Sequence, residues 1–163
     1  MKNRRILTVH LAALLLAVST PLFVQADTLV VLNKSEATAS LIDLETGKVR
    51  ATLPTDFGPH EAAASPDGRL ALVGNYGSRD KPGSTLTVIN VPTAKVVKTI
   101  DLGEYRRPHG LLFLPDGHRA LVTAEDNKVL LEIDLESWKI VRLLEAGREP
   151  DGMAYSSLDV KKH

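Results

Sequence analysis

The sequence contains no cysteine, few aromatic residues (4%), and none of the short motifs that indicate common catalytic or cofactor-binding sites. Without cysteine the chain forms no disulfides, which excludes a small scaffold held together by them. Nucleophile-elbow, phosphate-loop and C-x-x-C-H haem-attachment motifs are also absent. Stability must therefore come from packing, and 44% apolar residues suffice for a core.

The first 26 residues are typical of an export signal. Three basic residues precede an apolar stretch over residues 6–18 that is short for a stable membrane span, and "VQA" at 24–26 supplies small residues for cleavage. We expect cleavage after Ala26, a periplasmic or secreted protein, and no membrane span in the mature chain. That chain carries 17 basic and 20 acidic residues and no basic stripe, so nucleic acid is not an expected partner.

The rest of the chain shows short runs of alternating, often β-branched apolar residues, which are typical of strands. No long amphipathic helical pattern interrupts them. The expected strands span residues 28–33, 38–44, 48–53, 60–65, 69–75, 84–91, 95–102, 109–114, 119–124, 128–135, 139–144 and 152–157. We therefore predict an all-β fold.

The strands repeat together with their turns. "GPHEAAASPDG" at 58–68 returns as "RPHGLLFLPDG" at 107–117, and "ETGK", "PTAK" and "ESWK" share another turn position. Pro59, Pro108 and Pro150 mark a third shared position at intervals of 49 and 42 residues, the longer interval containing the inserted loop "GSRDKPGS". Four strands in a period of about 42 residues are typical of β-propeller blades.

Two copies are close enough to a known pattern to name it. "PHEAAASPDGRLALVGN" (59–75) and "PHGLLFLPDGHRALVTA" (108–124) resemble the YVTN-type repeats of exported bacterial β-propellers, and "VINVPTAKVVKTIDLG" (88–103) resembles their closing hairpin. Leu114 replaces the usual Ser, and the third copy keeps only "EPDGMAYSS" (149–157). The resemblance implies a partial blade at 27–55, blades at 56–103 and 104–146, the start of another at 147–157, and a tail at 158–163.

About three blades are too few to close a propeller ring, which needs four to eight. Two interpretations stay open. The chain is either part of a longer propeller, which "LDVKKH" at 158–163 favours, or a subunit that closes a ring as a homodimer. In the second case each copy donates residues 152–157 as an inner strand to residues 28–33 of the other.

The position after the repeated proline holds His60, His109 and Asp151. In a propeller this position begins the innermost strand of each blade, so its side chains gather near one mouth of the central channel. Two imidazoles and a carboxylate can ligate a divalent metal ion. With Arg107 they can instead bind a small molecule. A third interpretation, which we favour here, gives these residues only a structural role at strand ends.

The predicted function is that of an exported binding or scaffold module for a small molecule, an envelope component or a protein partner. The alternative is part of a propeller enzyme or cofactor-associated protein, because propellers similar to these include lactonases, lyases and quinoprotein or haem-linked dehydrogenases. We assign no catalytic residue, since the repeated position offers too few groups for an acid–base constellation. The fold alone does not select a ligand.

Overall fold

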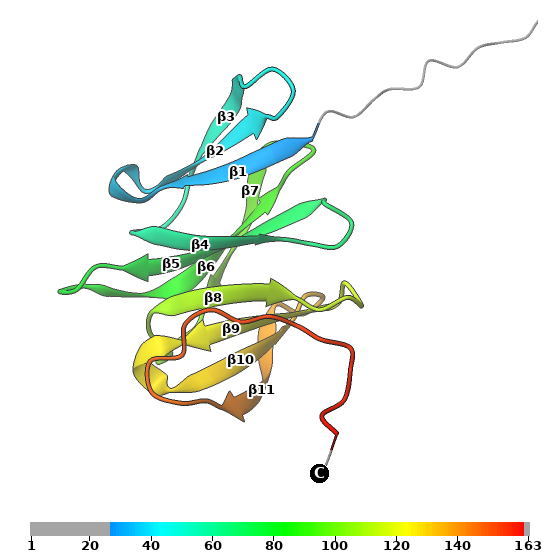
Figure 1. Ribbon diagram of the computed structural model, residues 1–163. Helices are drawn as coiled ribbons and strands as arrows, with labels where there is room; N and C mark the ends of the chain where they lie inside the picture. The colour runs from blue at the N-terminus through cyan, green and yellow to red at the C-terminus, as the bar shows by residue number, and fades with distance from the viewer. Residues whose placement is uncertain (1–26, 162–163) are drawn as a thin grey trace, which may run out of the picture.

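The computed structural model describes residues 27–161, and these fold into three antiparallel sheets (Figure 1). Blade 1 contains β1 (Thr28–Asn33), β2 (Thr38–Asp43) and β3 (Val49–Pro54). Blade 2 contains β4 (Pro59–Ala64), β5 (Leu70–Gly77), β6 (Pro82–Asn90) and β7 (Lys95–Asp101). Blade 3 contains β8 (Pro108–Phe113), β9 (Arg119–Ala124), β10 (Val129–Asp134) and β11 (Lys139–Glu145). The predicted all-β class is confirmed.

Two short 3-10 turns complete the described structure, η1 (Lys34–Glu36) after β1 and η2 (Glu125–Asn127) after β9. Within residues 27–161 no helix is long and apolar enough to cross a membrane. The expected export signal, residues 1–26, lies outside the described residues.

The same turn chemistry closes the outer hairpin of every blade. A carboxylate or amide oxygen accepts a hydrogen bond from the backbone N–H three residues later, at 2.7 to 3.0 Å, in Asp43, Asn90 and Asp134. The residue after this N–H donor then adopts a left-handed conformation, with φ of 66°, 49° and 58° at Gly47, Ala94 and Trp138. The turn position shared by "ETGK", "PTAK" and "ESWK" is therefore a shared backbone conformation.

Blade 1 has no innermost strand among the described residues, because β1 occupies the position of β5. The Nδ2 of Asn33 donates to Thr38 and Ser40 of the next strand, at 3.0 and 2.9 Å. Asn75 at the end of β5 makes the same pair of bonds to Thr85 and Thr87, both at 3.0 Å. The repeat therefore aligns β1 with the second strand of blade 2.

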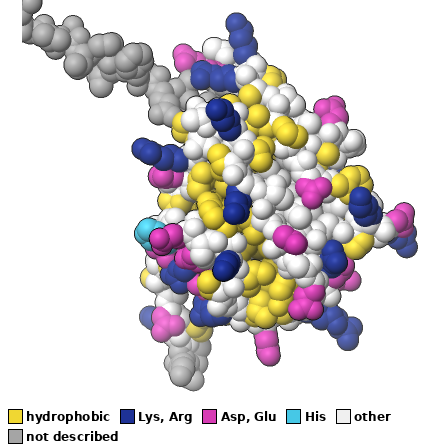
Figure 2. Space-filling view, turned by 180° about the vertical axis from the view of Figure 1, so that it is seen from behind, with side chains coloured by type: hydrophobic (Ala, Val, Ile, Leu, Met, Phe, Trp, Pro, Cys, Tyr) yellow, Lys and Arg dark blue, Asp and Glu magenta, His cyan; other side chains and the backbone are white. Residues whose placement is uncertain are grey.

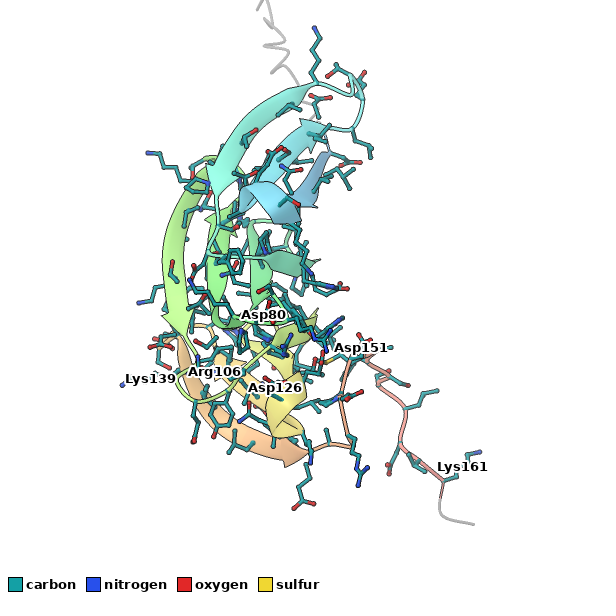
Figure 3. The ribbon with its side chains drawn as sticks, turned by 90° about the vertical axis from the view of Figure 1, so that its left-hand side faces the viewer. Asp80, Arg106, Asp126, Lys139, Asp151 and Lys161 are labelled. Carbon is teal, nitrogen blue, oxygen red and sulfur yellow. The ribbon has the colours of Figure 1, made fainter. Side chains whose placement is uncertain are left out.

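Apolar side chains fill the two spaces between blades. Between blades 2 and 3 the fully buried side chains include Leu72, Leu86, Val88, Val122, Leu131 and Ile133. A smaller cluster between blades 1 and 2 contains Ala39, Leu41, Ala71, Val73 and Ile89. The blades thus stack face to face in a curved array, with β4 and β8 along one side and the outermost strands along the other (Figure 3).

The strand expected at residues 152–157 does not form, and this prediction is wrong. The chain nevertheless starts along the path of a next inner strand. The Thr123 hydroxyl donates to the carbonyl oxygen of Asp151 at 3.0 Å, and this carbonyl lies so close to Gly110 that no Cβ fits there. A strand needs a neighbour to satisfy its backbone groups, and the residues described beyond 145 contain none.

The surface carries charges of both signs. Figure 2 shows basic and acidic side chains interspersed over one face, with apolar patches between them. Charges of opposite sign lie close together on this face.

Candidate functional site at the start of the inner strands

The repeated histidines lie side by side. His60 and His109 are the second residues of β4 and β8, and their ring centroids are 4.5 Å apart. The two inner strands pack against each other, so equal positions in neighbouring blades become neighbours in space. This arrangement agrees with the prediction that the residues after the repeated prolines come together from different blades.

The backbone conformation that leads into these strands is also repeated. The residue before each proline is left-handed, with φ of 65° at Gly58, 55° at Arg107 and 50° at Glu149. Only the first is a glycine, and the reason is space, because a Cβ on Gly58 would collide with the backbone of Gly77. The chain therefore enters each blade by the same bend and aims the residue after the proline the same way.

A tyrosine joins the two imidazoles. The ring centroid of Tyr76 lies 5.1 Å from that of His60 and 5.3 Å from that of His109, the second contact being edge-to-face. The Tyr76 hydroxyl donates to the Glu125 carboxylate, whose two oxygens are both 2.9 Å away. Burial, reinforced by this hydrogen bond, raises the pKa of Tyr76 above its usual value. We call His60, Tyr76 and His109 the ring cluster.

Arg107 supports this cluster from behind. Its guanidinium contacts Asp126 at 3.0 Å, donates to the carbonyl oxygen of Arg79 at 3.0 Å, and lies 5.0 Å from the centroid of the Tyr76 ring. The Arg107 side chain is only 15% exposed. Asp126 lies at the blade 3 end of the stack in Figure 3. These contacts join blades 2 and 3 through Arg107, and its predicted contact with a ligand stays a prediction.

Asp151 lies behind His109. Its Oδ1 is 2.8 Å from Nδ1 of His109, and the Asp151 side chain is 71% exposed. This ring nitrogen is buried and has no aligned hydrogen bond, because the carboxylate lies out of line with the N–H direction. A small rotation of the exposed carboxylate would align the pair. Figure 3 shows Asp151 on the side of the inner strands, opposite Lys139 on β11.

Glu61, which the sequence did not single out, completes a set of three ligand groups. One ligand atom each from His60, Glu61 and His109 lie within 4.8 Å of one another. Nδ1 of His60 is 3.8 Å from Oε1 of Glu61. Desolvation by burial, with the positive charges of Lys34 and His109, lowers the pKa of His60. A lowered pKa favours the neutral imidazole, which is the form that ligates metals.

Three further residues that sequence reasoning missed share one repeat position at the end of the second strand. Lys34 and Glu125 directly follow β1 and β9, and Tyr76 is the penultimate residue of β5. The Nζ of Lys34 lies 5.3 Å from the centroid of the Tyr76 ring. The second strand ends where the neighbouring inner strand begins, so this position faces the histidines. Applying the repeat to the ends of second strands, as well as to the starts of inner strands, would have identified these three residues.

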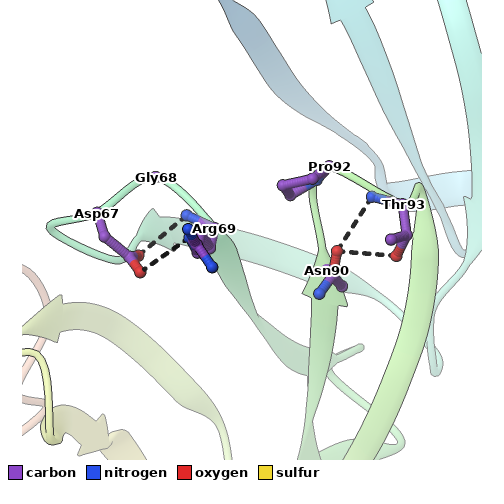
Figure 4. Close-up of a pocket in the computed structure, with 6 residues that line it drawn as sticks. All are labelled: Asp67, Gly68, Arg69, Asn90, Pro92 and Thr93. Carbon is purple, nitrogen blue, oxygen red and sulfur yellow. Dashed lines mark hydrogen bonds and ion pairs between the residues drawn. The ribbon is translucent and has the colours of Figure 1, made fainter.

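A surface hollow of about 530 Å³ elsewhere is not a comparable site. It lies between the turn at 67–69 and the turn at 90–93 (Figure 4). Its polar groups already bond within their own turns, since Asp67 accepts from the backbone of Arg69, and Asn90 accepts from Thr93. Few groups remain to recognise a ligand there.

Comparison with known proteins assigns the fold. No protein-family profile and no curated protein matches the chain. Among solved structures, hydrazine synthase of Kuenenia stuttgartiensis is similar at 24% identity and a TM-score of 0.67, over 77% of this chain and 34% of that chain. Dihydro-heme d1 dehydrogenase NirN in complex with DHE is similar at 23% identity and a TM-score of 0.63, over 80% and 28%.

The fold is that of β-propeller blades. The chain spans about a third of the length of these solved chains. At this identity the likeness concerns the fold alone.

Proposed function

We propose that the protein is an exported propeller module, of the YVTN type, that binds a planar small molecule at its ring cluster. The observation that carries this proposal is the convergence of His60, Tyr76 and His109 from two blades, with centroids 4.5 to 5.3 Å apart. Aromatic faces and edges attract other planar π-systems, and the His60 side chain is 32% exposed. The His60 ring is thus the part of the cluster that is accessible to a flat ligand, because the His109 side chain is only 13% exposed.

The chemistry of the cluster also fits a haem-type ligand. Imidazole is a common axial ligand of haem iron, and the lowered pKa of His60 favours the neutral form. Lys34, beside the Tyr76 ring, supplies a positive charge for an acidic substituent. One similar solved structure is the dihydro-heme d1 dehydrogenase NirN in complex with DHE, which supports this class of ligand.

Hemin is the probe that tests the proposal. Titrated into the untagged exported protein, hemin should saturate at one molecule per chain and shift its Soret band. A variant with both His60→Ala and His109→Ala should lose that shift, whereas His118→Ala, in an exposed turn, should retain it. A Soret band that does not move, or that moves equally in the double variant, would overturn the proposal.

In a second candidate function, this chain forms one part of a cofactor-associated enzyme. It is favoured by the short span of this chain, 28% to 34% of the solved chains it resembles, one of which is a dehydrogenase and the other a synthase. In that case further blades supply the missing catalytic groups. Mass measurement of the native exported product distinguishes the two, because a longer product supports the enzyme and one ending at residue 163 supports the module.

A further inference from the structure

We propose that His60, Glu61 and His109 bind one first-row divalent metal ion, such as Zn²⁺, with Asp151 orienting His109. Two imidazoles and one carboxylate form a ligand set that leaves positions open for water or another ligand. This site rests on the geometry of these four side chains and does not depend on the planar ligand proposed above.

The spacing of the donor atoms is close to what an ion requires. The three ligand atoms lie within 4.8 Å of one another. Zn²⁺ binds nitrogen and carboxylate oxygen at about 2.0 to 2.2 Å in a tetrahedron, so its ligand atoms are about 3.3 to 3.6 Å apart. The donor atoms must therefore approach one another by about 1 Å, and the Glu61 side chain, 47% exposed, is free to move.

Asp151 gives His109 the orientation of a metal ligand. A metal-bound histidine almost always donates its other ring N–H to a carboxylate or carbonyl, which selects the tautomer and holds the ring. The Asp151 carboxylate lies 2.8 Å from the buried Nδ1 of His109, and that nitrogen makes no aligned hydrogen bond within the described chain. The 71% exposed carboxylate is free to turn toward the N–H of this ring. Nε2 is then the nitrogen that carries the lone pair. The sequence predicts Asp151 as a metal ligand, whereas in this proposal Asp151 orients the ligand His109.

The charges around the cluster favour a dication. Four carboxylates lie around the rings, Glu61, Glu125, Asp126 and Asp151, and within the described chain Glu61 and Asp151 contact only histidines and no Lys or Arg side chain. Lys34 and Arg107 are the basic groups nearby, and Arg107 is already held by Asp126. The uncompensated negative charge lowers the free energy of a bound cation.

The test uses Zn²⁺ and Co²⁺ with the untagged, metal-free exported protein. Calorimetry should show one Zn²⁺ per chain with a Kd of micromolar or below, and Co²⁺ should give visible absorption bands of a low-coordinate site. Glu61→Gln should raise the Kd about tenfold, Asp151→Asn about tenfold through the lost orienting contact, and His109→Ala at least about 100-fold. Glu45→Gln and His118→Ala are matched controls in exposed turns and should leave the Kd unchanged.

Far-ultraviolet circular dichroism checks that each variant is folded, and His109→Gln serves if His109→Ala is not. Binding that is absent at millimolar Zn²⁺, or that survives both His109 variants, would overturn the site. So would a Kd that Glu61→Gln leaves unchanged. Zn²⁺ binding without hemin binding would overturn the planar-ligand function and retain this site, and the opposite result would do the reverse.

Discussion

Blades 2 and 3 have the same strand order but differ in the side chains at the end of the second strand, which are polar in blade 2 and apolar in blade 3. In blade 2, Asn75 donates to Thr85 and Thr87, both at 3.0 Å. In blade 3, Ala124, Val129 and Leu131 occupy the corresponding positions. Blade 1 repeats the polar version through Asn33.

The difference shows that side chains must fill the space at this place in the blade, and that either hydrogen-bonded polar side chains or apolar side chains can do so. The polar version has a cost, because Oδ1 of Asn75 is buried without a hydrogen-bond partner among the described residues. The apolar version has no polar group to satisfy. The same two blades also differ in cover, since blade 2 lies between two sheets, whereas one face of blade 3 has no described sheet against it.

The largest expected effect concerns the number of sheets packed against each blade, two for blade 2 and one for blade 3 among the described residues. Leu72→Ala should lower the free energy of unfolding by about 2 to 5 kcal/mol, because the Leu72 side chain is fully buried between blades. Leu121 occupies the same position in blade 3 but is only partly buried, so Leu121→Ala should cost about 1 kcal/mol. Urea unfolding measures both. Equal losses would mean that another surface covers the free face of blade 3 in solution.

The next effect concerns the three hydrogen-bonded side chains of blade 2, Asn75, Thr85 and Thr87. Asn75→Ala should lower the free energy of unfolding by about 1 to 3 kcal/mol, because the buried hydroxyl of Thr87 loses its partner. Adding Thr85→Val and Thr87→Leu copies the blade 3 set and should recover most of that loss. If the triple variant is less stable than Asn75→Ala alone, blade 2 depends on the polar chemistry and the two versions are not interchangeable.

A smaller effect concerns the left-handed turn position. Ala94 has a φ of 49°, where glycine avoids a steric cost of about 1 kcal/mol, partly offset by the greater freedom of glycine in the unfolded chain. Ala94→Gly should therefore raise stability by about 0.5 kcal/mol, and the reciprocal Gly47→Ala should lower it by about 1 kcal/mol. Thermal unfolding compares the two. A loss of stability in Ala94→Gly would show that the contact of its methyl group with the core outweighs the backbone term.

The smallest effect concerns the carboxylates of the repeated Pro-Asp-Gly turns. A hydrogen bond from Ser65 is the main cause of the lowered pKa of Asp67, whereas Asp116 has its pKa lowered by the backbone of His118 and by Arg119. A folded-state pKa below the unfolded value of 3.8 contributes stability above about pH 4, and this is lost as the pH falls through the folded-state pKa. Ser65→Ala should raise the pKa of Asp67 and leave that of Asp116 unchanged, as carboxyl NMR titration would show.

Much of the fold was predictable because each strand carries its own signal. Alternation and turn residues located β1 to β11 within one or two residues at most ends, since neighbouring strands in a meander are joined by short local hairpins. The strand expected at 152–157 failed because its sequence resembles an inner strand but its pairing partner is not in the described chain. Strand formation there depends on long-range pairing, which a local pattern does not report.

The candidate site was predictable only in part. The repeat located His60 and His109, because repetition in sequence becomes adjacency in a stack. It did not point to Tyr76 or Glu61, since other residue types occupy their positions in the other blades, and it did not report that Arg107 contacts Asp126 and that Asp151 contacts His109. Their positions depend on which way each side chain turns in a crowded space.

The sequence by itself determined the all-β class, the four-strand period and the pairing of the two histidines, because hydrophobic alternation and turn chemistry act over a few residues. Only the tertiary structure decided which carboxylate faces the histidines and which lies behind them. Those contacts join residues far apart in the chain, such as Tyr76 with Glu125 and His109 with Asp151, and arise from the packing of one blade on the next.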